Sequence, residues 1–152
     1  MKDQYLHRER SRLKSIRGLA PDATDAQRQN HFARYYCVLV CGFVENCVKI
    51  IVHDFVEKAG RRESASYIRN RIGRFSDIGK QELSTFAHSF SNLWGEKLDS
   101  YLDGAAGAAL DSLKNIRNQV AHGGNLSTSL GQIDGYFREI DDLINFLDEL
   151  FR

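Results

Sequence analysis

The sequence contains very little proline and no excess of charge of either sign. One proline among 152 residues excludes collagen-like and proline-rich architectures and favours long, uninterrupted helices. Lysine and arginine total 21 against 20 aspartates and glutamates, so any nucleic-acid binding must come from a local basic patch. Apolar residues make up 42% and charged residues 27%, which is typical of a folded globular domain rather than a disordered chain.

The sequence also gives no indication of a signal peptide or a membrane span. Residues 1–17 are charged throughout and have no apolar core. The most apolar stretch, residues 35–56, contains Glu45, Lys49 and Asp54, and charged side chains are costly in a bilayer. We therefore interpret this stretch as the buried helix of a soluble, cytoplasmic protein with no membrane partner.

Cysteine is scarce, and all three cysteines lie in this stretch: Cys37, Cys41 and Cys47. No second pair of Cys or His residues stands at metal-ligand spacing, so the sequence predicts no metal site and no cofactor. We expect the cysteines to be small buried hydrophobic residues in a reducing compartment.

Apolar residues recur with a helical period along most of the chain, and no segment alternates as a strand does. We predict an all-α bundle formed by one domain, residues 1–152, in which residues 1–21 are a basic N-terminal helix and its linker. The segment from about residue 22 to 58 should be the central helix, ended by Gly60. Further helices are expected at 80–102, 108–122 and 129–151, with a break at 104–107 and an acidic outer face on the last helix.

Residues 58–74 carry a local excess of positive charge, with six basic residues against the single acid Glu63. Five arginines of this segment are candidates for contacts with nucleic-acid phosphates: Arg61, Arg62, Arg69, Arg71 and Arg74. A solvated connecting segment explains the same composition equally well.

A second polar cluster lies on the predicted helix 108–122. At about 100° per residue, its apolar side chains form one stripe. Its polar residues share another arc, around the small Ala121: Lys114, Arg117, Asn118 and His122. A cationic fork, an amide and an imidazole on one arc suit a phosphate. An ordinary solvated helix face with a C-terminal histidine is the alternative.

The central helix carries a third group of polar residues. Glu45 and Lys49 stand four apart, an orientation that favours an ion pair, and Asn46 and His53 lie on the same side. Buried polar groups need partners, which could be each other, another helix or the Arg117 arc. The alternative is a network that only fixes the packing.

Residues 117–122, Arg-Asn-Gln-Val-Ala-His, resemble the R-x4-H motif of the HEPN superfamily of all-helical ribonucleases, in which a following Gly pair is typical. Glu45 and Lys49 are similar to the family's second feature, an acidic or polar residue four before a basic one. The likeness runs from about residue 30 to the end and is greatest to the RiboL-PSP and related prokaryotic HEPN subfamilies. Some HEPN toxins carry a tyrosine, modified by a partner nucleotidyltransferase, where this chain has Gly124.

This resemblance implies a homodimer that cleaves RNA without a metal, through attack of the ribose 2′-OH on the adjacent phosphate. His122 would be the general acid or base, and Arg117 would bind the phosphate. Asn118 would orient either His122 or the phosphate. Glu45, Lys49 and Lys114 would support the site.

The resemblance also implies a role in anti-phage defence or a toxin–antitoxin system, with an antitoxin or defence protein as a partner. Two alternatives stay open: a non-catalytic HEPN module that binds RNA or a partner protein, and a helical bundle with a chance motif.

Overall fold

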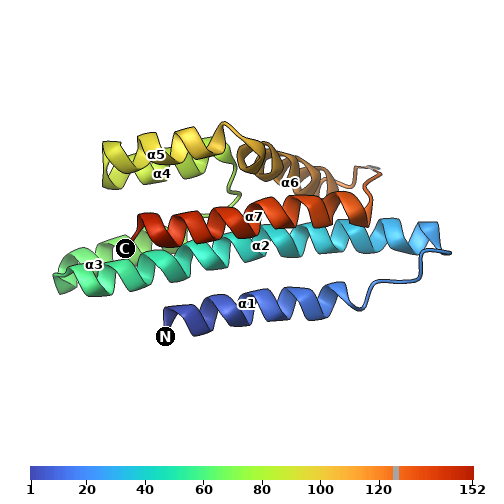
Figure 1. Cartoon of the computed structure of the whole chain (residues 1–152), viewed down its shortest axis with the longest axis horizontal. Coiled ribbons are helices and arrows are strands. Elements are labelled where there is room, and N and C mark those ends of the chain that lie inside the picture. The colour runs from blue at the N-terminus through green and yellow to red at the C-terminus, as the bar shows by residue number, and fades with distance from the viewer. Residues whose placement is uncertain (125–126) are drawn as a thin grey trace.

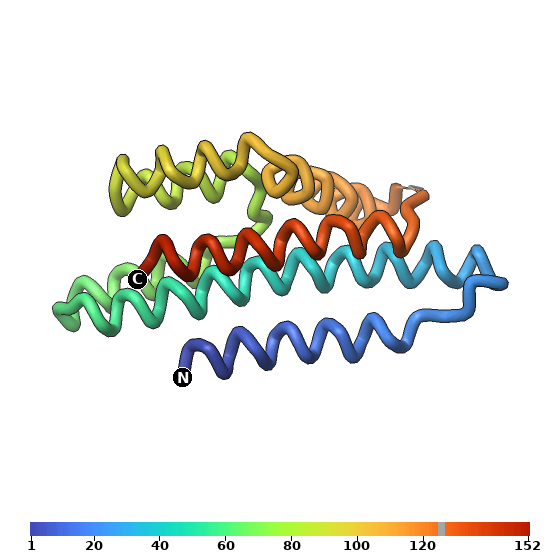
Figure 2. Tube along the Cα trace, viewed as in Figure 1, coloured from blue at the N-terminus to red at the C-terminus, as the bar shows by residue number. Residues whose placement is uncertain are grey.

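The computed structural model describes residues 1–124 and 127–152, which form seven helices and no strand. The long helix α2 (Ala26–Ala59) lies at the centre, and α7 (Leu130–Leu150) runs beside it (Figures 1 and 2). The all-α prediction is therefore confirmed. Asp25 caps α2 by accepting the Arg28 N–H at 3.1 Å, and Gly60 follows the last residue of the helix, as predicted.

Helix α2 forms the core because it is apolar on most of its sides. Eleven of its residues, from Ala33 to Val56, are buried, and α1, α3, α6 and α7 all pack on it. By length and composition α2 could cross a membrane, but half of its most apolar window is buried inside the bundle. Core helices share these properties.

Helix α1 (Lys2–Arg17) packs on α2 and is tied to α7 by charge. Of its residues, Leu6 and Leu13 are buried. Its basic side chains reach acids that stand seven apart on α7, in the pairs Lys2–Asp148 at 2.5 Å, Arg10–Asp141 at 2.5 Å and Arg17–Asp134 at 2.9 Å. The prediction of an acidic outer face on α7 is thus wrong in part, because α1 covers three of those acids.

The segments between α2 and α6 differ most from the prediction. Residues 62–73 form a helix, α3 (Arg62–Gly73). The predicted helix 80–102 is a hairpin of α4 (Lys80–Phe90) and α5 (Asn92–Leu102), with Ser91 between them in extended backbone. The Ser91 hydroxyl accepts the Trp94 N–H at 3.4 Å and so caps α5.

The expected break at residues 104–107 is shorter, because α6 (Ala105–Ala121) begins directly after Gly104. Gly107 lies inside the helix. A Cβ at this position would overlap the Leu102 carbonyl, so the glycine permits the tight turn from α5 into α6.

Candidate functional site

Helix α6 has one side in the core and one side at the surface. Leu113 and Ile116 are buried, whereas Lys114, Arg117 and Asn118 are half-buried. His122 is exposed and ends the helix as its C-cap. The structure therefore places the four residues of the predicted arc outside the core, in the last turns of one helix.

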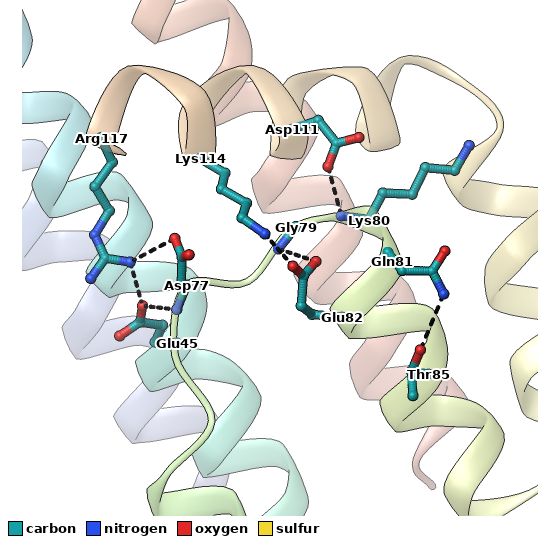
Figure 3. A network of polar contacts seen from close by, with 10 residues as sticks. All are labelled: Glu45, Asp77, Gly79, Lys80, Gln81, Glu82, Thr85, Asp111, Lys114 and Arg117. Carbon is teal, nitrogen blue, oxygen red and sulfur yellow. Dashed lines mark hydrogen bonds and ion pairs between the residues drawn. The ribbon is translucent and has the colours of Figure 1, made fainter. Parts of the chain in front are cut away.

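Arg117 is held by two carboxylates from different elements (Figure 3). Its Nη1 donates to Glu45 Oε1 on α2 at 3.1 Å, and Asp77 Oδ1 lies 3.6 Å from the same nitrogen. The Asp77 backbone N–H also donates to Glu45 Oε1, at 3.1 Å. In Figure 3 the contacts to both acids start from this one nitrogen of the guanidinium. The Arg117 side chain, 31% exposed, is thus fixed at one nitrogen and open at the others.

Asp77 is the residue of this cluster that the sequence analysis did not single out. It lies in the loop between α3 and α4, with a φ of 55° in the left-handed region. Aspartate tolerates this backbone better than most residues do. An isolated Asp in a loop has no helical spacing that would connect it with Arg117, so no sequence pattern indicates its role.

Lys114, one turn before Arg117, has an acidic partner of its own in Glu82 on α4. The hydrogen bond to Lys114 lowers the pKa of Glu82, and the same bond raises the pKa of Lys114. Glu82 also accepts the Gly79 N–H at 3.2 Å, while Asp111 accepts the Lys80 N–H at 2.8 Å. These bonds join the start of α4 to α6, which fixes the loop that carries Asp77.

His122 stands at the open end of α6. Its backbone N–H donates to the Asn118 carbonyl at 3.1 Å. The ring is exposed, and among the described residues it has no hydrogen-bond partner. The imidazole is therefore accessible to a ligand at this end of α6.

The polar residues of α2 do not form one network. Glu45 faces Arg117, whereas Asn46 donates to Glu9 on α1 at 3.1 Å. Lys49 and His53 line an open groove of about 530 Å³ between α1 and α2. Within the described chain, Glu45 and Lys49 make no ion pair. The structure thus brings Glu45 to the arc on α6 and leaves Lys49 beside α1.

The five arginines of the basic segment are all exposed and lie on or next to α3. Arg71 donates to the Tyr67 hydroxyl at 3.5 Å, and Tyr67 is itself exposed. Figure 1 shows α3 beside the end of α2 that finishes at Ala59. Glu45 lies 14 residues before Ala59, which corresponds to about 21 Å along the helix axis. The end of α3 at Arg61 and Arg62 is therefore far from Arg117, whereas Arg74 at the other end stands only three residues before Asp77, which contacts Arg117.

The three cysteines are free thiols, and Cys37 and Cys41 both donate to the Leu113 carbonyl of α6 at 3.6 Å. A hydrogen bond with Cys37, together with burial, raises the pKa of the Cys41 thiol, so this sulfur stays protonated beneath Arg117. No group of three or more potential metal ligands occurs among the described residues. Cys37 and Cys41 act here as packing residues between α2 and α6.

The family comparison agrees with this arrangement of helices. The model of the RiboL-PSP-HEPN family matches residues 3–152, which includes α1 as well as the segment that carries the motif. Searches of curated proteins and of solved structures find no match. A family match over nearly the whole length is decisive, and the chain belongs to the RiboL-PSP-HEPN family.

Proposed function

We propose that this protein is a metal-independent endoribonuclease whose site combines Arg117 and His122 from two copies of the chain. The observation that carries the proposal is the Arg117 guanidinium, which Glu45 fixes at Nη1 while Nη2 and Nε make no bond to either acid. A fixed guanidinium with free donors suits a phosphate. The exposed His122 lies five residues on, about 7.5 Å along the axis of α6.

In the proposed reaction the ribose 2′-oxygen bonds to the adjacent phosphorus, and the bond from phosphorus to the 5′-oxygen breaks. The products are a 2′,3′-cyclic phosphate and a free 5′-hydroxyl. One His122 takes the proton of the 2′-OH, and the other gives a proton to the leaving 5′-oxygen. Arg117 stabilises the charge that develops on the phosphate oxygens, and Asn118, one turn before His122, orients the ring or the phosphate.

A second copy is needed because one chain supplies only one imidazole to this reaction. Helix α2 offers a surface for it beside Glu45. Tyr35 is 54% and Val38 37% exposed, and a Cβ at the nearby Gly42 would meet nothing within 4 Å. Exposed apolar side chains next to a polar cluster favour a contact between copies, and two-fold symmetry would bring the two α6 helices together.

The arginines of α3 would then hold RNA outside the cleavage site. On family likeness alone we extend the proposal to a role in anti-phage defence or in a toxin–antitoxin pair. The exposed arginines of α3 favour a second candidate, a non-catalytic HEPN module that binds RNA or a protein through α3. Both candidates retain the helical bundle, and cleavage separates them.

The deciding experiment is incubation of the purified chain with total RNA in the presence of excess EDTA. Cleavage that yields 2′,3′-cyclic phosphate ends and leaves DNA intact supports the proposal, because DNA has no 2′-OH. His122→Ala should abolish cleavage. His7→Ala, which changes an exposed histidine on α1, is the matched control and should cleave normally. Binding of RNA without cleavage by the wild type would favour the non-catalytic module.

A further inference from the structure

The two carboxylates that contact Arg117 are held very differently. Glu45 projects from the middle of α2, is 16% exposed and lies within hydrogen-bonding distance of Nη1. Asp77 comes from a loop and is 46% exposed, and its Oδ1 lies 3.6 Å from the same nitrogen, beyond that distance. Glu45 is therefore a fixed partner of Arg117, whereas Asp77 is a replaceable one.

Asp77 keeps its position against two local penalties. Its backbone has the left-handed φ of 55°, which residues other than glycine seldom adopt, and such strain gathers at functional sites. Its Oδ1 is shielded from solvent, yet it has no hydrogen-bond partner in the described chain. The bond from its N–H to Glu45 and the attraction to Arg117 oppose these penalties. A ligand that neutralises the charge of Arg117 removes the second of these stabilising interactions, the attraction between Asp77 and Arg117.

The charges around Arg117 also leave Asp77 in excess. Lys114 pairs with Glu82, and Arg117 pairs with Glu45. Asp77 adds a third carboxylate to these two cations, on the guanidinium itself. A phosphate that approaches Arg117 meets this negative charge at short range, and like charges at such distances repel.

We propose that Asp77 restrains phosphate binding at Arg117 and turns away from the guanidinium when a phosphate binds there. The ligand is a phosphate anion. Under the proposed function, on which this step rests, it is the scissile phosphodiester of RNA. Asp77 then lowers the affinity of the resting site for RNA, and removal of its charge makes binding tighter.

Inorganic phosphate tests the exchange without any need for ribonuclease activity. Asp77→Asn keeps the shape of the side chain and tolerates the left-handed backbone, but it removes the charge. The matched control is Asp103→Asn, an exposed acid that pairs with Lys80. By calorimetry, Asp77→Asn should bind phosphate roughly three- to tenfold more tightly than the wild type, and the control should differ by less than about twofold.

Two further variants identify the cause of this gain. Adding Arg117→Ala should abolish it, because the phosphate then has no guanidinium to bind. Asp77→Gly, which also relieves the backbone, should show the same gain as Asp77→Asn. Circular dichroism establishes that each variant is folded. Phosphate affinity that is unchanged or weaker in both Asp77 variants overturns the proposal.

Single-stranded RNA separates this proposal from the proposed function. In a His122→Ala background, which leaves RNA intact, Asp77→Asn should bind the RNA several-fold more tightly. In the active background it should lower KM without raising kcat. If phosphate binding improves but the wild type never cleaves RNA, the exchange at Arg117 stands and the nuclease proposal fails. If RNA is cleaved but Asp77→Asn improves neither phosphate affinity nor KM, the nuclease proposal stands and the proposed exchange at Arg117 fails.

Discussion

Glu45 Oε1 accepts hydrogen bonds from both the Arg117 guanidinium and the Asp77 backbone, each at 3.1 Å. One oxygen thus joins α2, α6 and the loop between α3 and α4. Because Glu45 projects from the central helix, the position of Arg117 depends on the packing of the whole bundle. A side chain that is already fixed loses less conformational freedom when it binds a phosphate, which is what a site for a charged substrate requires.

Arg117→Ala should abolish RNA cleavage while the chain remains folded. The side chain lies outside the core, and its partly exposed ion pair contributes about 1 kcal/mol or less to folding. Activity on RNA and the free energy of unfolding in urea test the two halves of this prediction.

The contrasting variant is Leu113→Ala on the opposite side of α6. Leu113 is fully buried, so this change should reduce the free energy of unfolding by roughly 2–5 kcal/mol. Should Arg117→Ala instead unfold the chain to a similar extent, the arginine has a structural role and the site is wrongly assigned.

Glu45→Gln should reduce cleavage far more than Lys49→Met does. The first change weakens the bond that positions Arg117, and each loss of about 1.4 kcal/mol in transition-state stabilisation lowers the rate about tenfold. Lys49 faces the groove beside α1, so Lys49→Met should lower the cleavage rate by less than about threefold. Rates measured on one RNA, with melting temperatures as the control for folding, compare the two. Equal losses would mean that Lys49 also supports the site.

The hairpin of α4 and α5 should be stabilised by a pH-dependent pair. His88 Nε2 lies 2.8 Å from Asp99 Oδ2, and this hydrogen bond raises the pKa of His88 and lowers the pKa of Asp99. A raised histidine pKa stabilises the fold below the ordinary value of about 6.5, and this stabilisation disappears as the pH rises through the raised pKa. The lowered pKa of Asp99 stabilises the fold above about pH 3.9, and this part disappears as the pH falls through the lowered pKa.

The test is the difference in melting temperature between the wild type and Asp99→Asn. It should be largest at about pH 5–6 and should shrink by about pH 9, where His88 is neutral. Asp103→Asn breaks an ion pair with a lysine, Lys80, rather than with a histidine, so its effect should change much less over this range. If the difference in melting temperature for Asp99→Asn does not change with pH, the charge of Asp99 contributes nothing to its pair with His88.

The sequence predicts the long helices well because each has a buried stripe and a clear end. Helix α2 ends at Gly60, and α7 begins after the capping Ser129. Helix α3 is not predictable in this way, because it buries only Ala65 and Ile72 among many charged residues. The break between α4 and α5 at Ser91 is not predictable either. No proline or glycine stands at this position, and the aromatic residues keep a helical spacing across it.

The candidate site is also predictable from the sequence only in part. Residues 114–122 are close in sequence and share one helix, so helix geometry alone places them together. The contact from Glu45 to Arg117 is one of several pairings that helical spacing leaves open. The role of Asp77 depends on a loop whose path follows from how α3 and α4 pack, and no local pattern encodes such a path.

The active unit should be a dimer with a shared site, and mixed variants test this directly. His122→Ala and Arg117→Ala should each be inactive alone, because every dimer then lacks both copies of one group. A mixed dimer retains one Arg117 and one His122 at the joint site. With the single imidazole acting as base or acid and water taking the other role, mixing the two inactive proteins should restore a small part of the activity. Leu113→Ala mixed with His122→Ala is the control and should not exceed the activity of its parents added together. A chain that sediments as a monomer at the assay concentration and still cleaves RNA at the full rate would exclude the composite site.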